Sequence, residues 1–148
     1  MIVEVGALVR DQIFKKFRAN QPASAAQIEQ CEAAIGFELP ASYQNFLKRQ
    51  NGGEGFIGPN AYVIFWRVTD LMEMNKAYQV GEYAPGLFIF GSDGGGEAYA
   101  FDIRNNEMLI VSVPFVGMGV SLARVVASNF DDFLDTLSGI GSPHADRD

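Results

Sequence analysis

Residues 39–53, LPASYQNFLKRQNGG, contain the start signal, the buried face and the stop signal of one short helix. Pro40 suits the first helical position, because its missing N–H would have no partner there and its fixed φ fits a helix. Asn51-Gly52-Gly53 tolerates left-handed backbone and can close the helix. Three apolar side chains fall on one face at helical spacing: Tyr43, Phe46 and Leu47. The stretch therefore predicts an amphipathic helix that packs against a core.

A second helix is predicted directly before this one. Ser24 is a suitable N-cap, and Gln27 stands at the capping-box position three residues later. Apolar residues then recur at helical spacing until Gly36, a residue type that often ends helices: Ile28, Cys31 and Ile35. Because only the short segment 36–39 joins the two helices, they are expected to contact each other.

The residues that start, line and stop these helices form one longer pattern. It reads Ile28-x3-Glu32-x3-Gly36-x2-Leu39-Pro40-x2-Tyr43-x2-Phe46-Leu47-x3-Asn51-Gly52-Gly53. This pattern resembles the signature of the SMI/KNR-type family of the SUKH superfamily. Later segments are similar to further elements of that family: Trp66, the turn at 91–97 and the block Asn129-Phe130-x2-Phe133-Leu134. The resemblance extends over residues 24–138.

The resemblance implies a function as well as a fold. Bacterial SUKH proteins are largely immunity proteins, which bind and neutralise polymorphic toxins, many of them nucleases. Fungal relatives act as interaction proteins in cell-wall regulation. The resemblance therefore implies a SUKH-like α+β domain that binds a cognate protein toxin and catalyses no reaction. A regulatory or scaffold protein of the cell-wall-regulator type is the alternative.

Length and composition favour a single domain in the cytoplasm. The chain has 148 residues, of which 48% are hydrophobic, enough for a sizeable core. No apolar run approaches the roughly 20 residues that cross a membrane, and the first residues lack the pattern of a signal peptide. The one cysteine, Cys31, cannot form an internal disulfide, so a reducing compartment is expected.

Acidic residues dominate the second part of the chain. The formal net charge is −7. Residues 1–50 contain six basic and five acidic side chains, whereas residues 51–148 contain five basic and thirteen acidic ones. Because nucleic acid is bound by basic surfaces, this charge disfavours nucleic acid as a direct partner. It favours a basic protein partner, although acidity also serves solubility alone.

The rest of the chain predicts strands joined by tight turns, with helices at both ends. Residues 7–19 have the pattern of an amphipathic helix, expected to pack on the core because it is short and lacks Trp. Residues 54–60 are interpreted as a glycine-rich loop. The predicted strands are 62–66, 87–91, 98–103, 108–113 and 122–126, and the predicted helices are 70–80 and 128–138. We therefore predict an α+β fold with a largely antiparallel sheet: an N-terminal helix and linker (1–23), the domain (24–138) and a tail (139–148).

The segment Ser92-Asp93-Gly94-Gly95-Gly96-Glu97 is the strongest candidate for a small-ligand site. Successive glycines can offer backbone N–H groups to an anion. A phosphate loop, however, also contains a lysine and opens a helix, and the acids here do not have the spacing of an EF-hand calcium loop. The pattern therefore favours a plain connection between strands. A small-ligand-binding domain, with a pocket gathering Asp93, Glu97 and aromatic residues, is the least favoured alternative.

No catalytic or metal-binding set stands out in the sequence. The single histidine, His144, lies in the tail, and no His/Cys cluster for zinc is present. Cys31 falls on the apolar side of a helix and is expected to be a buried thiol. We therefore expect no catalytic, metal-binding or cofactor-binding residues. The residues expected to contact a protein partner are one aromatic anchor and four acids: Trp66, Glu54, Asp93, Glu97 and Asp102.

Overall fold

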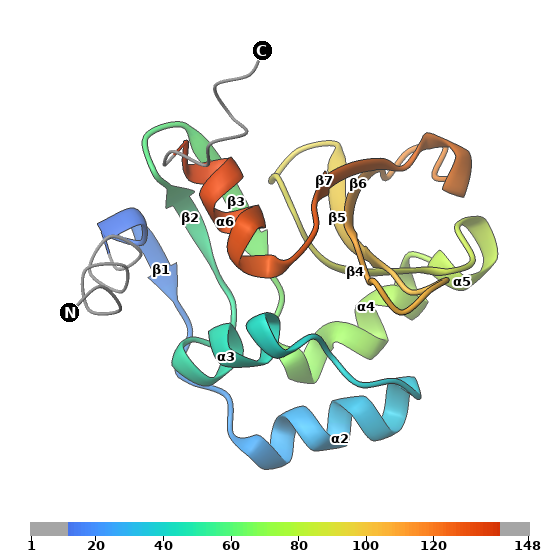
Figure 1. Ribbon diagram of the computed structural model, residues 1–148, viewed down its shortest axis with the longest axis horizontal. Helices are drawn as coiled ribbons and strands as arrows, with labels where there is room; N and C mark the ends of the chain where they lie inside the picture. Colours follow the sequence, from blue (N-terminus) through green and yellow to red (C-terminus); the bar gives the residue numbers. More distant parts are fainter. Residues whose placement is uncertain (1–11, 140–148) are drawn as a thin grey trace.

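The computed structural model describes residues 12–139 as an α+β unit built on one antiparallel sheet (Figure 1). Seven strands of this described part lie side by side in the order in which they occur in the chain. Their bounds are β1 (Phe17–Ala19), β2 (Gly53–Ile57), β3 (Ala61–Phe65), β4 (Leu87–Ser92), β5 (Glu97–Asp102), β6 (Ile110–Pro114) and β7 (Arg124–Ala127). Each strand pairs with the next in antiparallel orientation. The predicted fold class is therefore confirmed.

The helices of the described residues lie before, between and after these strands. Their bounds are α2 (Ala25–Ile35), α3 (Ala41–Arg49), α4 (Leu71–Ala77), α5 (Val80–Tyr83) and α6 (Phe130–Ser138), with short 3-10 turns η1 (Val68–Asp70) and η2 (Val120–Leu122). In Figure 1, α2 and α3 lie at one end of the sheet, and α6 lies in front of its strands.

The predicted pair of N-terminal helices is confirmed, together with its capping. The Ser24 hydroxyl accepts from the Gln27 backbone N–H, and the Gln27 side chain accepts from the Ser24 N–H. Gly36 ends α2 in the left-handed conformation, with φ 85°. Pro40 is the N-cap of α3 rather than its first helical residue, a shift of one position from the prediction. The sequence therefore determines this unit through local signals alone.

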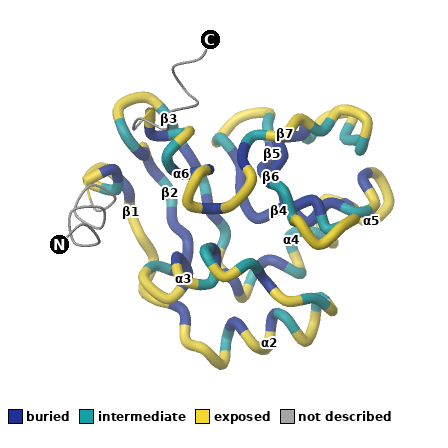
Figure 2. The backbone as a smooth tube through the Cα atoms, viewed as in Figure 1, coloured by how far each residue is buried: buried dark blue, intermediate teal, exposed yellow. Residues whose placement is uncertain are grey.

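The main core lies on one side of the sheet, which we call the inner face. Tyr43 and Phe46 of α3 and Phe130 of α6 pack there against strand residues such as Phe65 and Phe90. Ring centroids lie 4.8 Å apart for Phe46 and Phe130 and 5.6 Å apart for Tyr43 and Phe90. Figure 2 shows the central strands buried along most of their length, whereas the outer side of α2 is exposed. Aromatic packing therefore holds α3 and α6 against the sheet.

The predicted helix over 7–19 is wrong at its C-terminal end. Residues from Phe17 to Ala19 form β1 and pair with β2, so the helical pattern does not continue there. The first part of that prediction, residues 7–11, lies outside the described residues. Phe17 is buried on the inner face. A strand therefore buries this apolar side chain as well as the predicted helix would.

The predicted glycine-rich loop over 54–60 is also wrong, because β2 occupies most of it. Its glycines allow the backbones of β1 and β2 to approach each other closely. A Cβ added to Gly53 would lie 2.3 Å from the carbonyl oxygen of Arg18, and one added to Gly55 would lie 2.6 Å from that of Lys16. Only glycine therefore lets β1 lie this near to β2.

The other predicted elements are present with shifted bounds. The five predicted strands correspond to β3, β4, β5, β6 and β7. The helix predicted over 70–80 is interrupted at Gln79, whose φ is 55°, so that α4 and α5 are separate. The last helix begins after Asn129, whose side chain accepts from the Asp132 N–H, rather than after Ser128. Gly139 ends it with φ 73°, as predicted.

Candidate functional site

The outer side of β1–β3 remains accessible, unlike the inner face of the same strands. Side chains alternate along each strand, and the inward set is buried. The outward set is exposed or half-buried, and we call it the open face: Arg18, Glu54, Phe56, Tyr62, Ile64 and Trp66. The strand register places Arg18 beside Glu54, Glu54 beside Ile64, and Phe56 beside Tyr62. The open face thus combines aromatic, aliphatic and charged groups on adjacent strands.

Glu54 is held at the centre of the open face by its neighbours. The Tyr62 hydroxyl donates to Glu54 Oε2, and this hydrogen bond to the carboxylate raises the pKa of Tyr62. Arg18 Nη2 lies 3.7 Å from the same oxygen, and the side chains of Arg18 and Glu54 are 79% and 44% exposed. An ion pair this exposed contributes little to stability. Glu54 is therefore oriented by Tyr62 and available for a stronger cationic partner.

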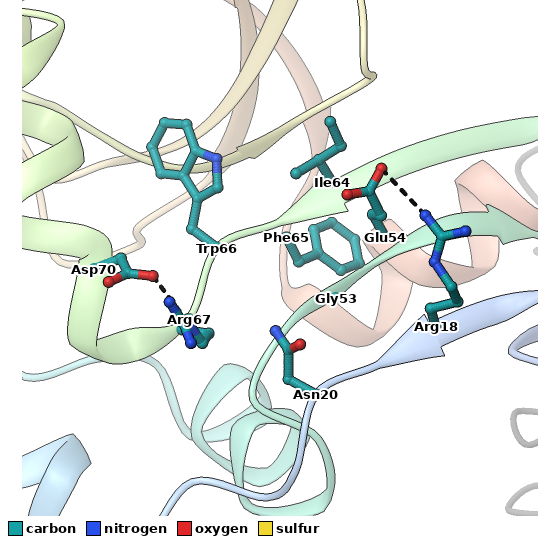
Figure 3. Close-up of a pocket in the computed structure, with 9 residues that line it drawn as sticks. All are labelled: Arg18, Asn20, Gly53, Glu54, Ile64, Phe65, Trp66, Arg67 and Asp70. Atoms are coloured by element: carbon teal, nitrogen blue, oxygen red, sulfur yellow. Dashed lines mark hydrogen bonds and ion pairs between the residues drawn. The ribbon is translucent and has the colours of Figure 1, made fainter.

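A hollow of about 290 Å³ opens beside Glu54 (Figure 3). One side is formed by Arg18 and Glu54, and the other by Arg67 and Asp70 of the η1 turn. Arg67 Nε lies 2.9 Å from Asp70 Oδ2. Figure 3 shows both ion pairs at opposite sides of the hollow, with the indole of Trp66 at its border. Its charged groups therefore belong to two ion pairs that both remain accessible to solvent.

Trp66 continues the open face towards α4 and α5. Its ring stacks on Tyr78 with a centroid distance of 6.0 Å and an interplanar angle of 4°. Tyr78 in turn lies 4.8 Å from the ring of Phe115, in the connection between β6 and β7. Tyr78 is 42% exposed. This row of three aromatic rings is part of an accessible surface, the type of group that anchors protein interfaces.

The acidic turn between β4 and β5 borders the open face without belonging to it. A Cβ on Gly94 would lie 2.8 Å from the ring of Tyr62, so the turn packs against that residue. Asp93 Oδ1 accepts from the N–H groups of Gly95 (2.7 Å) and Glu97 (3.2 Å). Burial, and after it the charges of Asp93 and Glu97, raise the pKa of Tyr99, which lies on the inner face. The turn therefore borders the open face, whereas Glu97 alternates in β5 with Tyr99 of the inner face.

Asp102 lies apart from the other predicted contact residues. It ends β5 at the opposite end from Glu97 and is only 7% exposed. Its carboxylate accepts hydrogen bonds from Arg104 Nε (2.9 Å) and Nη2 (2.8 Å). These hydrogen bonds keep the pKa of Asp102 below its ordinary value. The structure therefore brings Glu54 and Trp66 together, places Asp93 and Glu97 nearby, and gives Asp102 a role in the next turn.

Groups that could carry covalent or metal chemistry are inert or dispersed in the described part. Cys31 is a free, buried cysteine, which confirms the predicted buried thiol. Burial and the charge of Glu32 raise the pKa of Cys31 to about 11, so it is a neutral thiol at physiological pH. Among residues 12–139, no three His, Cys, Asp or Glu side chains gather as metal ligands would. His144 lies outside the described residues.

Comparison with known families agrees with this architecture. The family described as the SMI1 / KNR4 family (SUKH-1) matches residues 22–136. The chain belongs to this family. A search of curated proteins found no match to the chain. No helix within residues 12–139 has the length and apolar character needed to span a membrane.

The signature residues Glu32 and Asn51 build the fold rather than the open face. Glu32 Oε2 accepts from the Leu39 N–H (2.7 Å) and from Gln44 Nε2 (3.1 Å), which fixes the connection between α2 and α3. Buried Asn51 accepts from the Val68 N–H (2.8 Å) through its side chain, so it fixes η1 against the end of α3. These two residues therefore stabilise the scaffold, whereas Trp66 is the family-like element that lies on the open face.

Arg18 and Phe56 belong to the open face but were missed by sequence reasoning. One signal was available for Phe56, because Glu54 and Phe56 alternate with glycines at the spacing of a strand. The glycines hid this alternation by suggesting a loop. Arg18 was assigned to a helix, where its relation to Glu54 could not be foreseen, since the two residues meet only through strand pairing.

Proposed function

We propose that this protein is an immunity protein that binds a toxin through the open face and thereby blocks the toxin's active surface. Binding alone performs this function, without catalysis by the immunity protein. Membership of the SMI1 / KNR4 family (SUKH-1) is consistent with a protein partner. The observation that carries the proposal is the open face itself, a strand surface with aromatic and acidic groups that the described chain leaves accessible.

The charges indicate a basic partner. Glu54 lies on the open face, and the turn that carries Asp93 and Glu97 borders it, in a chain of net charge −7. A nuclease toxin carries basic groups to bind phosphate, and complementary charge accelerates the encounter of two proteins. The hollow beside Glu54 fits an inserted cationic side chain, which would pair with Glu54 better than the loosely placed Arg18 does. A toxin that acts on nucleic acid is met in the cytoplasm, where the free thiol of Cys31 is stable.

The test is a rescue experiment with a candidate toxin taken from the genes next to this one. Cells that express the toxin are complemented with the wild-type chain or with Glu54→Lys. The matched control is Glu29→Lys, which reverses an exposed charge on α2. We expect wild type and Glu29→Lys to restore growth, and Glu54→Lys to fail. Failure of the wild type to bind the toxin would contradict the immunity function, and full rescue by Glu54→Lys would contradict the open face as the binding surface.

A further inference from the structure

A second, apolar groove lies between α4, α5 and the end of α2. Its hollow measures about 280 Å³. The apolar lining comes from four parts of the chain: Ile35, Phe37, Met72, Leu87, Phe88 and Ile103. The rings of Phe37 and Phe88 meet edge to face with centroids 5.2 Å apart, which fixes one wall. Phe37 and Ile103 also line an adjoining hollow of about 330 Å³ towards Met108. The two hollows therefore adjoin at Phe37 and Ile103, but the second is also lined by polar residues, among them Glu38.

Two polar side chains at one end of this groove remain available. Lys76 is the only charged residue that lines the 280 Å³ hollow. It is exposed, and within residues 12–139 no carboxylate forms an ion pair with it. Gln79 lies one helical turn away, and its side-chain amide makes no hydrogen bond to a described group. Asn75, by contrast, is fully used, since it bonds the backbone of Leu71 and both backbone groups of Ile89.

The backbone at this end of the groove is held in an unusual conformation. Gln79 has φ 55° and ψ 41°, the left-handed region that non-glycine residues rarely adopt. Its carbonyl accepts from the N–H groups of Glu82 and Tyr83, which stabilises the turn. Met108, with φ 48°, lies at the far end of the adjoining hollow. Non-glycine residues in this region cluster at binding sites, where the surrounding structure sustains the strain.

We propose that this groove binds a free carboxylic acid with a medium-length apolar chain. The chain lies along the floor of Phe37, Phe88 and Ile103, and the carboxylate pairs with Lys76 and accepts from the Gln79 amide. A small hydrophilic anion would gain nothing from the apolar floor, and a cation would be repelled by Lys76. A neutral lipid would not gain the charge-assisted hydrogen bond from Lys76. This site is separate from the open face and does not depend on the proposed toxin binding.

Decanoate, below its micellar concentration, is the probe for this proposal. We expect amide shifts in a two-dimensional NMR titration of the full chain to centre on Phe37, Lys76, Gln79 and Ile103. Decanol should bind more weakly than decanoate, because it lacks the charge. Vesicles of phosphatidylglycerol offer acyl chains and negative charge in a bilayer, and we expect the chain not to bind them. The absence of decanoate binding, shifts centred on the open face, or preferential binding to the vesicles would each overturn the proposal.

Lys76→Met separates the charge from the apolar floor. It keeps an apolar stem of similar length, and we expect it to weaken decanoate binding about threefold, equivalent to about 0.7 kcal/mol, while leaving decanol binding unchanged. The matched control is Lys48→Met, the same substitution on an exposed residue of α3 outside the groove. It should retain wild-type affinity for decanoate. Equal affinity of Lys76→Met and wild type for decanoate would contradict the assignment of the carboxylate site.

Discussion

The outer side of the sheet is built in two different ways along its width. Over β4–β6 it is apolar, and we call this part the covered face: Leu87, Ile89, Ala98, Ala100, Val111 and Val113. Val80 of α5 and its C-cap Ala84 pack over it, together with side chains from the connection between β6 and β7. Over β1–β3 the open face carries mixed aromatic, acidic and basic groups, and it remains accessible.

The difference shows which part of the outer side is buried by the chain's own side chains and which part is left for a partner. Every strand residue of the covered face is at most 5% exposed, so burial there already contributes to folding. The open face gains no such burial, but its groups are suited to an interface with a polar rim and aromatic anchors. We therefore expect substitutions on the covered face to change stability, and substitutions on the open face to change binding.

The largest effect on stability is expected from truncating an isoleucine on the covered face. Ile89→Ala removes a side chain that is 0% exposed and should lower the free energy of unfolding by about 2–5 kcal/mol. Ile64→Ala is the matched substitution on the open face, where Ile64 is half-buried, and should cost less than about 2 kcal/mol. Urea unfolding of both variants measures the difference. Equal losses of unfolding free energy in the two variants would contradict the difference in burial between the two faces.

The junction of β1 and β2 should respond strongly to a single added methyl group. Gly55→Ala places a Cβ 2.6 Å from the Lys16 carbonyl oxygen, at a φ of +142°. We expect a loss of about 1–3 kcal/mol, with faster hydrogen exchange in β1. Gly96→Ala is the control, because a Cβ there would meet nothing within 4 Å. A neutral Gly55→Ala would mean that β1 does not pack closely on β2.

Asp102 should contribute to stability in a pH-dependent way. Its pKa is lowered from the ordinary 3.8 by the hydrogen bonds from Arg104, so its contribution is present above about pH 4 and is lost as the pH falls through the folded-state pKa. We expect Asp102→Asn to cost about 1 kcal/mol at neutral pH. The difference from wild type should shrink on acidification. Thermal unfolding between pH 7 and the lowest pH at which the chain stays folded tests this, with Glu29→Gln as an exposed control.

The smallest effect on stability is expected at the centre of the open face. Glu54→Lys removes an exposed ion pair and one hydrogen bond from Tyr62, and the free energy of unfolding should change by less than about 1 kcal/mol. Urea unfolding measures this directly. A loss of several kcal/mol would make Glu54 a structural residue and would remove the basis for reading its variants as binding defects.

The parts of the fold that could be predicted from the sequence are those determined by residues close together in the chain. The pair α2–α3 was predicted because Ser24, Gly36 and Gly52 act on their immediate neighbours. The strands β4, β5 and β6 were predicted because continuous apolar runs are buried on both sides. The edge β1–β2 was missed, because Gly53 and Gly55 serve a contact with Arg18 and Lys16 that is distant in the sequence.

The candidate site was only partly predictable for the same reason. Glu54 and Trp66 were selected by residue type, and strand pairing placed both on the open face. Asp102 was selected by the same criterion. Its carboxylate, however, already accepts a hydrogen bond from Arg104, only two residues along the chain. Sequence alone did not distinguish an acid paired by its own turn from one held by a tyrosine on the adjacent strand.

Amide hydrogen exchange of the chain with and without the neighbouring toxin tests the central claim most directly. Bound toxin should slow exchange by tenfold or more within residues 53–66 and in the turn at 92–97, whereas α2 should exchange as in the free chain. This pattern would show that the toxin occupies the open face. Tight binding of the toxin with exchange in residues 53–66 unchanged, and protection confined to α2 or to the covered face, would contradict the account.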